Sequence, residues 1–233
     1  MSRVAHRLVL VRHGSSDWNM SNRFTGWTDV PLTDKGVEQA TRAGLRLVEA
    51  GITFDELHTS VLHRTYQTAD SLLTAAQHKS IPHYAHWRLN ERHYGQLQGL
   101  QKQDIFARWG EQNALHWWRG YLAVPPPLEL NDSRHPRIDP LYKELDPNLL
   151  PSSESLADCQ QRVLPYWHEV LLPSLFAGRS ALVVSHGNTI RSLLMHLENI
   201  SPDEITKMEI APGVPLVLQF NQAMKMVGRE WLE

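Results

Sequence analysis

Short runs of apolar residues alternate with segments of helical spacing along the first third of the chain. The run over residues 8–11 has four consecutive apolar residues, a pattern typical of a parallel strand that is covered on both faces. A helix is predicted over residues 35–49, with Thr33 as its N-cap and Gly51 as its closing glycine. The inward face of this helix is expected to carry Val37, Ala40, Gly44, Leu47 and Val48.

The same alternation continues along the chain and predicts a layered fold. Strands are expected over residues 54–60 and 81–86, on either side of a helix over residues 63–76. Further helices are expected over 102–119, 153–172 and 188–199, and further strands over 181–184 and 216–220, the last as an edge strand. We therefore predict an α/β protein of three layers, α/β/α, with helices on both faces of a mostly parallel central sheet.

Proline sets the middle of the chain apart. Seven of the 14 prolines fall between Pro125 and Pro151, and because proline fixes φ and removes a backbone donor, this stretch is not a regular helix or a central strand. We interpret residues 100–151 as an insertion within a single domain that spans residues 1–233. A long insertion of this kind is commonly a cover over a site, and a passive surface insertion is the alternative. Farther along, Pro165 is expected to kink a helix that begins after Ser152 or Ser153.

Composition narrows the class of protein. The 233 residues are 42% hydrophobic, enough for a sizeable core, and the net charge of -2 gives no general attraction to nucleic acid or to anionic membranes. The single cysteine, Cys159, rules out an internal disulfide framework. The chain has no apolar run of about 18 residues and no signal-peptide core at its start, so we expect a cytoplasmic protein.

Two predicted strands end in the same pair of residues, histidine and glycine. The first runs into Arg12-His13-Gly14 and the second into Ser185-His186-Gly187, while Arg64 follows a third predicted strand. Because ligands bind at the carboxyl ends of parallel strands, these side chains are expected to meet at one edge of the sheet. Arginine forks and imidazoles suit a phosphoryl group in transfer, whose charge is spread over three oxygens. No metal is required, and no paired metal-ligand spacing occurs in the sequence.

The nucleophile and the proton donor have candidates as well. A neutral imidazole is a competent nucleophile near pH 7, and by chemistry alone either His13 or His186 fits this role. Glu91 lies among cations and a phenol in Asn90-Glu91-Arg92-His93-Tyr94-Gly95, which makes it the candidate general acid and base. The alternative is an exposed turn with a surface ion pair.

These segments resemble the histidine phosphatase superfamily and, more narrowly, the 2,3-bisphosphoglycerate-dependent phosphoglycerate mutases. The resemblance covers nearly the whole chain. An Arg-His-Gly triplet alone is weak evidence, whereas the further segments together are specific to the mutases. The matching segments are Arg12-His13-Gly14, Trp18-Asn19, Asn22-Arg23-Phe24-Thr25-Gly26-Trp27, Val30-Pro31-Leu32-Thr33, Leu89 to Gly95, Leu97-Gln98-Gly99-Leu100, Glu154-Ser155-Leu156, His186-Gly187-Asn188 and Gly213-Val214-Pro215-Leu216.

The resemblance implies a reaction and a role for each residue. The reaction is the interconversion of 2- and 3-phosphoglycerate in glycolysis and gluconeogenesis, with 2,3-bisphosphoglycerate donating the priming phosphate. His13 is implied as the nucleophile that becomes phosphohistidine, Glu91 as the proton donor and acceptor, and His186 as the group that stabilises the transition state. Arg12 and Arg64 complete the phosphate pocket. The residues implied to hold the phosphoglycerate are Asn19, Thr25, Gly26, Arg92, Tyr94, Lys102, Arg119, Gly187 and Asn188.

The chain departs from the family pattern in three places. The family usually has two adjacent arginines before the glycine that is Gly120 here, whereas this chain has Trp118-Arg119, so we expect weaker priming by the bisphosphate. Ser15 and Asp17 replace glutamates that are common in the family, and the C-terminus is more acidic than usual. Family members are often homodimers or homotetramers.

Two other functions use the same residues. A phosphatase would form the same His13 intermediate and let water accept the phosphate, and Trp118 weakly favours this alternative. A non-catalytic phosphate-binding or scaffold protein is more remote, because both histidines and Glu91 are present.

Overall fold

The core of the protein is one six-stranded sheet in the order β3-β2-β4-β1-β5-β6. The computed structural model describes residues 4–78 and 80–233. The strands are β1 (His6–Arg12), β2 (Glu56–Thr59), β3 (His83–Ala85), β4 (Ala181–Ser185), β5 (Pro215–Phe220) and β6 (Met226–Trp231). The first four strands are parallel to one another, and β5 and β6 are antiparallel additions beside β1. The mostly parallel sheet of the prediction is confirmed.

The register between β1 and β4 sets the position of the two histidines. Arg12 lies opposite Ser185, so His13 and His186 leave neighbouring strands at the same level. The backbone N–H of His13 also donates to the carbonyl of Ser185 at 2.9 Å, which continues the pairing past the last residue of the strand.

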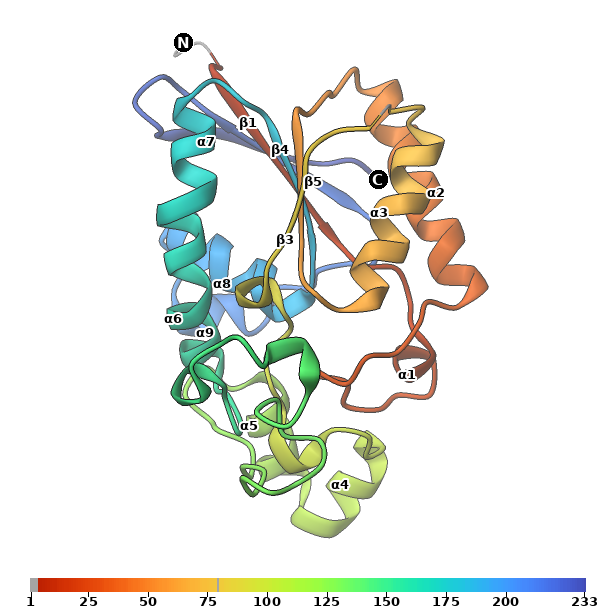
Figure 1. The fold of residues 1–233 in the computed structure, drawn as a ribbon, viewed down its shortest axis with the longest axis vertical. Coiled ribbons are helices and arrows are strands. Elements are labelled where there is room, and N and C mark those ends of the chain that lie inside the picture. Colours follow the sequence, from red (N-terminus) through yellow and green to blue (C-terminus); the bar gives the residue numbers. More distant parts are fainter. Residues whose placement is uncertain (1–3, 79) are drawn as a thin grey trace.

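Helices cover both faces of the sheet, as Figure 1 shows. On one face lie α2 (Asp34–Glu49) and α3 (His63–Ala75), and on the other lie α6 (Leu156–Tyr166), α7 (Leu172–Phe176) and α8 (Gly187–Glu198). Side chains of a strand alternate between the faces: Val9 and Val11 pack in the core under α2 and α3, and Leu8 and Leu10 in the core under α6 to α8. The three-layer prediction is therefore confirmed.

Several element boundaries agree with the sequence, and some residues on them do not. Thr33 caps α2, its hydroxyl accepting from the Gly36 N–H at 3.2 Å. Val37 and Val48 were expected inside but are 41% and 53% exposed. Ala40, Gly44 and Leu47 are buried as expected. Ala43 is buried as well, and with Leu47 it packs in the core that includes residues of α3.

Three predicted elements are changed by the structure. β5 is not an edge strand, because β6 pairs with it on the outer side. The helix expected over 102–119 is two helices, α4 (Lys102–Trp109) and α5 (Glu111–Arg119), which Gly110 separates with a φ of 81°. α6 begins at a capping box on Ser155, not at Ser152 or Ser153.

Helix α6 is interrupted after its proline. Pro165 lies inside α6, and residues Trp167–Leu171 form a π-helical turn before α7. Pro165 removes only the helical hydrogen bond to the carbonyl of Gln161, within α6, and the π-helical turn begins after it. Two short helices, α1 (Asp17–Met20) and α9 (Pro202–Ile205), were not expected. No helix in the described ranges is long and apolar enough to cross a membrane.

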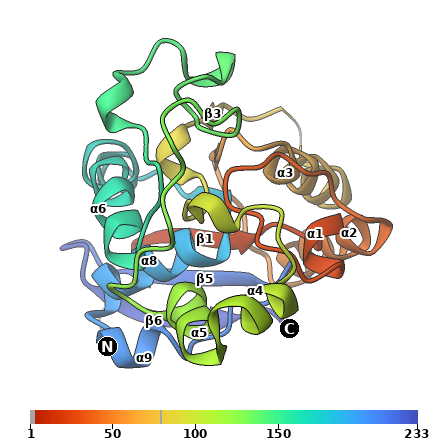
Figure 2. The ribbon, with the colours of Figure 1, turned by 90° about the horizontal axis from the view of Figure 1, so that it is seen from below.

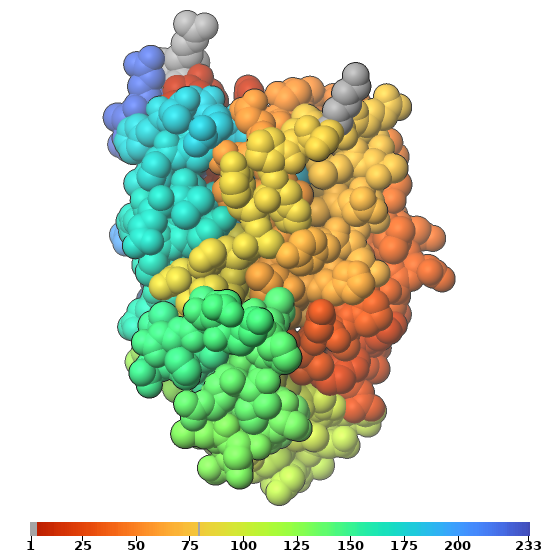
Figure 3. Space-filling view, in the orientation of Figure 1, coloured from red at the N-terminus to blue at the C-terminus, as the bar shows by residue number. Residues whose placement is uncertain are grey.

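The segment 100–151 lies beyond the end of the sheet at which β1 and β4 finish (Figures 1 and 2). It holds α4, α5 and short 3-10 turns at Pro140–Tyr142 and Pro147–Leu149. In Figure 3 the surface of this segment lies directly against that of the loop between β1 and α2. Tyr94, Phe24 and residues of α4 and α5 form a small separate core that joins this segment to the sheet's loops.

Candidate active site

Two buried imidazoles lie side by side at the ends of β1 and β4. The ring centroids of His13 and His186 are 5.0 Å apart, with an angle of 62° between the ring planes. His13 is 3% exposed and His186 is fully buried. Residues 173 positions apart in the sequence thus form one pair, in line with the expected meeting of their two strands.

The backbone fixes the tautomer of His13. Its Nδ1 lies 2.7 Å from the carbonyl oxygen of Gly14, and since a carbonyl only accepts, Nδ1 carries the proton. The lone pair of the neutral ring is then on Nε2. Burial, followed by the charges of Arg64 and Arg12, lowers the pKa of His13 well below 6.5. His13 is therefore a neutral imidazole with a free Nε2 at physiological pH.

A close backbone contact holds the His13 loop in place. A Cβ on Gly14 would lie 2.2 Å from the carbonyl oxygen of Gly36, and one on Gly36 would lie 2.2 Å from the carbonyl of Ser15. The Gly14 N–H donates to Thr68 Oγ1 at 3.1 Å. Glycine is needed at both positions because helix α2 begins in direct contact with this loop.

His186 is bonded on one side only. Its Nε2 is 2.8 Å from Ser60 Oγ, while its buried Nδ1 has no hydrogen-bond partner among the described residues. Burial, and next the charge of Arg64, lowers the pKa of His186 well below 6.5. This ring is also neutral at physiological pH until an anion arrives beside it.

Arg12 and Arg64 are held by backbone carbonyls through their terminal guanidinium nitrogens. Arg12 Nη1 donates to Ile210 at 2.7 Å, and Arg64 donates to Gly26 at 2.7 Å and to Thr28 at 3.0 Å. The Nε of each guanidinium is buried without a partner in the described part of the chain. Burial lowers the pKa of Arg64 to about 10, which leaves it a cation at neutral pH.

The carboxylate of Glu91 is held by two backbone amides. Its Oε1 accepts from the N–H of Arg92 at 2.8 Å and from the N–H of Asn188, at the start of α8, at 3.2 Å. The carbonyl of Glu91 accepts from Trp27 Nε1 at 2.6 Å. These bonds fix both the main chain and the side chain of Glu91 beside the two strand ends.

Arg162 of α6 holds the segment that carries Glu91. Its guanidinium pairs with Glu154 at 2.6 Å and donates to the carbonyls of Arg88 at 2.8 Å, Asn90 at 3.2 Å and Glu91 at 3.1 Å. Both charged side chains are almost fully buried. The position of Glu91 therefore depends on a buried ion pair in a neighbouring helix.

We expect Arg162→Met to lower the free energy of unfolding by about 3–5 kcal/mol, because Glu154 is left as an unpaired buried charge. Urea denaturation measures the loss. Arg229→Met is the control, since the Arg229–Glu198 pair is partly exposed and is worth at most about 1 kcal/mol. A loss of similar size in both variants would contradict the prediction.

Two further histidines, the buried His93 and the partly buried His86, make stability depend on pH. Burial lowers the pKa of His93 to about 3 and of His86 to about 4. Below pH 6.5 the unfolded chain binds protons that the folded chain does not, so the free energy of unfolding falls as pH drops from about 6.5 toward 4. For the buried His93 the slope reaches about 1.4 kcal/mol per pH unit at the acid end of that window, and for His86, which is partly exposed, it is smaller.

Urea titrations between about pH 7.5 and pH 5 test this dependence, with His93→Gln as the comparison variant. We expect a shallower slope of unfolding free energy against pH in the variant than in the wild type. Equal slopes would show that His93 does not remain neutral in the folded protein.

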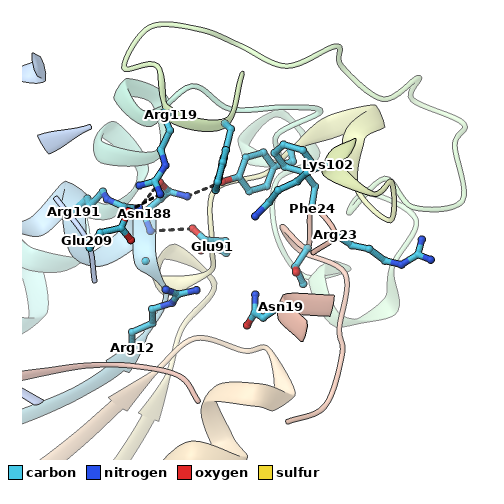
Figure 4. Close-up of a pocket in the computed structure, with 14 residues that line it drawn as sticks. Arg12, Asn19, Arg23, Phe24, Glu91, Lys102, Arg119, Asn188, Arg191 and Glu209 are labelled. Atoms are coloured by element: carbon cyan, nitrogen blue, oxygen red, sulfur yellow. Dashed lines mark hydrogen bonds and ion pairs between the residues drawn. The ribbon is translucent and has the colours of Figure 1, made fainter. Parts of the chain in front are cut away.

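A cavity of about 260 Å³ is lined by Arg12 and Gly187, which directly precede His13 and follow His186 in the sequence, and Figure 4 shows its lining. Nine of the residues named from the sequence line it: Arg12, Asn19, Thr25, Glu91, Tyr94, Lys102, Arg119, Gly187 and Asn188. The other five, His13, Gly26, Arg64, Arg92 and His186, are buried and do not line the cavity. Within the described residues, no group of three His, Cys, Asp or Glu side chains is arranged to hold a metal ion.

Five more residues line the cavity. Trp118 was identified only as a departure from the family pattern, and Arg23 and Phe24 belong to a matching segment that was not assigned to the site. Arg191 lies one helical turn after Asn188, a spacing that could have marked it. Glu209 follows the short helix α9, and no motif or spacing in the sequence marks it as a residue of the site.

The indole of Trp118 lies between two cations. Lys102 Nζ is 4.0 Å from the centre of its ring, and the Arg119 guanidinium carbon is 4.7 Å away. Burial, followed by the charges of Arg119 and Arg12, lowers the pKa of Lys102 to about 8. Trp118 thus occupies a place at which a cation would be repelled by two others.

Comparisons with known proteins agree with this geometry. The model of the histidine phosphatase superfamily (branch 1) matches residues 8–148 and 132–228. A 2,3-bisphosphoglycerate-dependent phosphoglycerate mutase of Nitratidesulfovibrio vulgaris is 47% identical over 231 residues, covering 97% of this chain and 91% of the relative. One from Hamiltonella defensa is 45% identical over 226 residues, with the same two coverages.

Solved structures support the fold. Bacillus stearothermophilus YhfR superposes with a TM-score of 0.72 at 24% identity and covers 96% of this chain and 95% of its own. A mycobacterial glucosyl-3-phosphoglycerate phosphatase in complex with VO3 has a TM-score of 0.68 at 24% identity, over 92% of each chain. The chain belongs to the histidine phosphatase superfamily, branch 1, and within it to the family of the 2,3-bisphosphoglycerate-dependent phosphoglycerate mutases.

Proposed function

We propose that this protein interconverts 2-phosphoglycerate and 3-phosphoglycerate through a phosphohistidine on His13. The observation that carries the proposal is the pair of neutral rings, His13 and His186, 5.0 Å apart, with their sequence neighbours Arg12 and Gly187 in the lining of a cationic cavity. Five cationic side chains line that cavity: Arg12, Arg23, Lys102, Arg119 and Arg191. The family membership and the names of the relatives support the same activity.

His13 is the nucleophile in this proposal because its proton is already on Nδ1. The Nε2 lone pair attacks the phosphorus of a bound phosphate ester, so the N–P bond forms as the ester P–O bond breaks. The carbonyl of Gly14 holds the ring through the reaction and stabilises the proton on Nδ1. The reverse transfer, to a different hydroxyl of the glycerate, regenerates the free imidazole.

The unpartnered buried atoms fit a phosphoryl group. Arg12 Nε, Arg64 Nε, His186 Nδ1 and Thr25 Oγ1 lack hydrogen-bond partners among the described residues. A buried polar group without a partner costs about 1–3 kcal/mol, so oxygens of an anion placed between them would satisfy several at once. The two guanidinium groups then neutralise charge, and His186 stabilises the transition state from its unpartnered Nδ1.

2,3-Bisphosphoglycerate, when bound, supplies the phosphoryl group that first loads His13. The cavity is lined with more cationic side chains than one phosphate group needs. The second phosphate of the bisphosphate can therefore pair with cations that the first does not use. Lys102 and Arg119 are the candidates, since both belong to the segment beyond the sheet's end.

Glu91 moves the proton of the reacting hydroxyl. Two backbone N–H groups hold its Oε1, and no hydrogen bond from the described residues reaches Oε2. The free oxygen gives a proton to the departing alkoxide and takes one from the accepting hydroxyl. A fixed carboxylate with one free oxygen beside a neutral nucleophile suits this role.

The remaining residues named from the sequence divide into two groups. Asn19, Thr25, Tyr94, Lys102, Arg119, Gly187 and Asn188 line the cavity and are proposed to hold the phosphoglycerate. Gly26 and Arg92 act through neighbours: the Gly26 carbonyl holds Arg64, and the Arg92 guanidinium donates to the carbonyls of Trp117 and Gly120 at the end of α5. Both are positioning residues in this proposal.

The segment 100–151, part of one domain over 1–233, is proposed to act as a cover. It contributes Lys102, Trp118 and Arg119 to the cavity. When the segment closes over a ligand, the side chains of Lys102 and Arg119 therefore approach that ligand. Excluding water at this point keeps the phosphohistidine from being hydrolysed.

Trp118 is expected to weaken priming. It offers one N–H and no charge where the family usually has an arginine. In Trp118→Arg, we expect the half-saturating concentration of 2,3-bisphosphoglycerate to fall about threefold or more, because a charge-assisted contact is gained. Trp118→Phe, which keeps the aromatic face, serves as control. An unchanged half-saturating concentration in Trp118→Arg would refute this effect.

A coupled assay with 3-phosphoglycerate, with and without 2,3-bisphosphoglycerate, tests the function. We expect 2-phosphoglycerate to be formed and the bisphosphate to stimulate its formation. Free phosphate released at a comparable rate would identify a phosphatase, and the absence of both products would leave a binding or scaffold protein.

The proposed reaction belongs to glycolysis and gluconeogenesis, which places the protein in the cytoplasm with small phosphoglycerates as its partners. A homodimer or homotetramer is proposed by analogy with the family, and light scattering on the purified protein measures this directly. With a net charge of -2, nucleic acid is not among the expected partners.

A further inference from the structure

Three arginines that line the cavity are held by three consecutive residues of one loop. The Met208 carbonyl accepts from Arg191 Nε at 2.9 Å, and the Ile210 carbonyl accepts from Arg12 Nη1 at 2.7 Å. Between them, the carboxylate of Glu209 accepts from Arg119 Nη2 at 2.7 Å. The arginines come from α8, β1 and α5, so this loop joins three parts of the fold at the cavity.

The three contacts differ in how easily a ligand can replace them. The two carbonyls are neutral main-chain groups, and Arg12 and Arg191 remain anchored through them whatever the cavity holds. Glu209 carries a full negative charge, and its side chain is 73% exposed, against 28% for Arg119. A partly exposed ion pair of this kind contributes little to stability. An incoming anion can therefore take the place of the carboxylate on Arg119.

Glu209 is also one of only two acidic residues in the lining of the cavity. The other, Glu91, is held by two backbone amides and has a part in the proposed reaction. Figure 4 shows Arg119 reaching down from the segment beyond the sheet toward Glu209 and Arg191. A carboxylate in this position competes with a ligand's anionic group for Arg119 and repels that group as well.

We propose that Glu209 is a specificity-determining residue that occupies Arg119 as an internal anion and so lowers the affinity for ligands with a second phosphate. The proposal rests on the proposed function, which needs a doubly phosphorylated donor. A ligand that reaches only Arg12 and Arg64 does not compete with Glu209. A small organic acid with two phosphates extends to Arg119 and must displace the carboxylate first.

The test compares the wild type with Glu209→Gln, which keeps the size of the side chain and removes its charge. We expect the half-saturating concentration of 2,3-bisphosphoglycerate in the mutase assay to fall about 3- to 10-fold in the variant. Inorganic phosphate is expected to bind only beside Arg12 and Arg64. Its inhibition constant is therefore expected to change less than about twofold. Glu198→Gln is the matched control, because Glu198 pairs with Arg229 at 2.6 Å outside the cavity lining.

Calorimetric titration with 2,3-bisphosphoglycerate keeps the test independent of turnover. It is carried out on His13→Ala and on His13→Ala/Glu209→Gln, in which no phosphoryl transfer takes place on His13. Tighter binding by the double variant would support the role of Glu209 even if the mutase reaction itself were not found. Unchanged or weaker binding, or an equal gain for inorganic phosphate, would overturn it while leaving the proposed function standing.

Discussion

Replacing His13 by alanine is expected to lower mutase turnover by at least about 10⁴-fold, because the variant lacks the proposed nucleophile of the covalent intermediate. The ring is buried beside His186, and its Nε2 is left free by the bond from Nδ1 to Gly14. His63→Ala, at an exposed residue that begins α3, is the matched control and should retain full activity. Steady-state kinetics with 3-phosphoglycerate and 2,3-bisphosphoglycerate measure both variants.

The outcome for His13→Ala separates two accounts of the histidine pair. Loss of turnover with normal binding of the bisphosphate assigns the nucleophile to His13. Turnover above about 1% of the wild type would instead mean that His186, the other ring of the pair, carries the phosphoryl group.

Glu91→Gln is expected to lower turnover of phosphoglycerate by about 10²- to 10⁴-fold, the usual contribution of a general acid and base. The amide retains an oxygen that accepts from the N–H groups of Arg92 and Asn188, so the loop should keep its position. The variant loses only the ability to exchange a proton. Glu144→Gln, whose side chain is 87% exposed, is the control.

A substrate with a good leaving group distinguishes proton transfer from misfolding. p-Nitrophenyl phosphate releases a stable phenolate that needs no proton, so its hydrolysis should fall far less in Glu91→Gln than turnover of phosphoglycerate. Equal losses for the two substrates would show that Glu91 acts through the shape of the site.

The central strands could be predicted because a strand that is buried on both faces has apolar residues at consecutive positions. The runs that became β1 and β4 are apolar at every position of 8–11 and 181–184, and both end in His-Gly. Parallel strands bring their ends to one edge, so the pairing of His13 with His186 followed from the pattern of the two strands.

Elements near the surface were harder to predict. β6 is an antiparallel strand with an intermediate and exposed surface, so its sequence has no buried run to mark it. The break between α4 and α5 rests on one residue, Gly110, in a periodic pattern that continues on both sides. Val37 and Val48 look inward by helical spacing, but the side of α2 that is buried depends on α3.

The site was predictable where chemistry and family pattern coincide. Arg12 and the two histidines are unusual residues at strand ends; the structure pairs the two histidines, and it places Arg12 and Glu91 in the lining of one cavity. Glu209 and Arg162 were not foreseen, because their importance comes from tertiary contacts: Glu209 meets Arg119 across 90 positions of sequence, and Arg162 reaches back 71 positions to Glu91. The spacing of residues along the sequence does not predict contacts between segments this far apart.

The most direct test of a phosphohistidine on His13 is the intact mass of the protein after incubation with 2,3-bisphosphoglycerate. We expect the wild type to gain the mass of one phosphoryl group and to lose it in acid, and His13→Ala to gain nothing. A wild type whose mass does not change, or a His13→Ala variant that gains the same acid-labile group, would contradict the proposed mechanism.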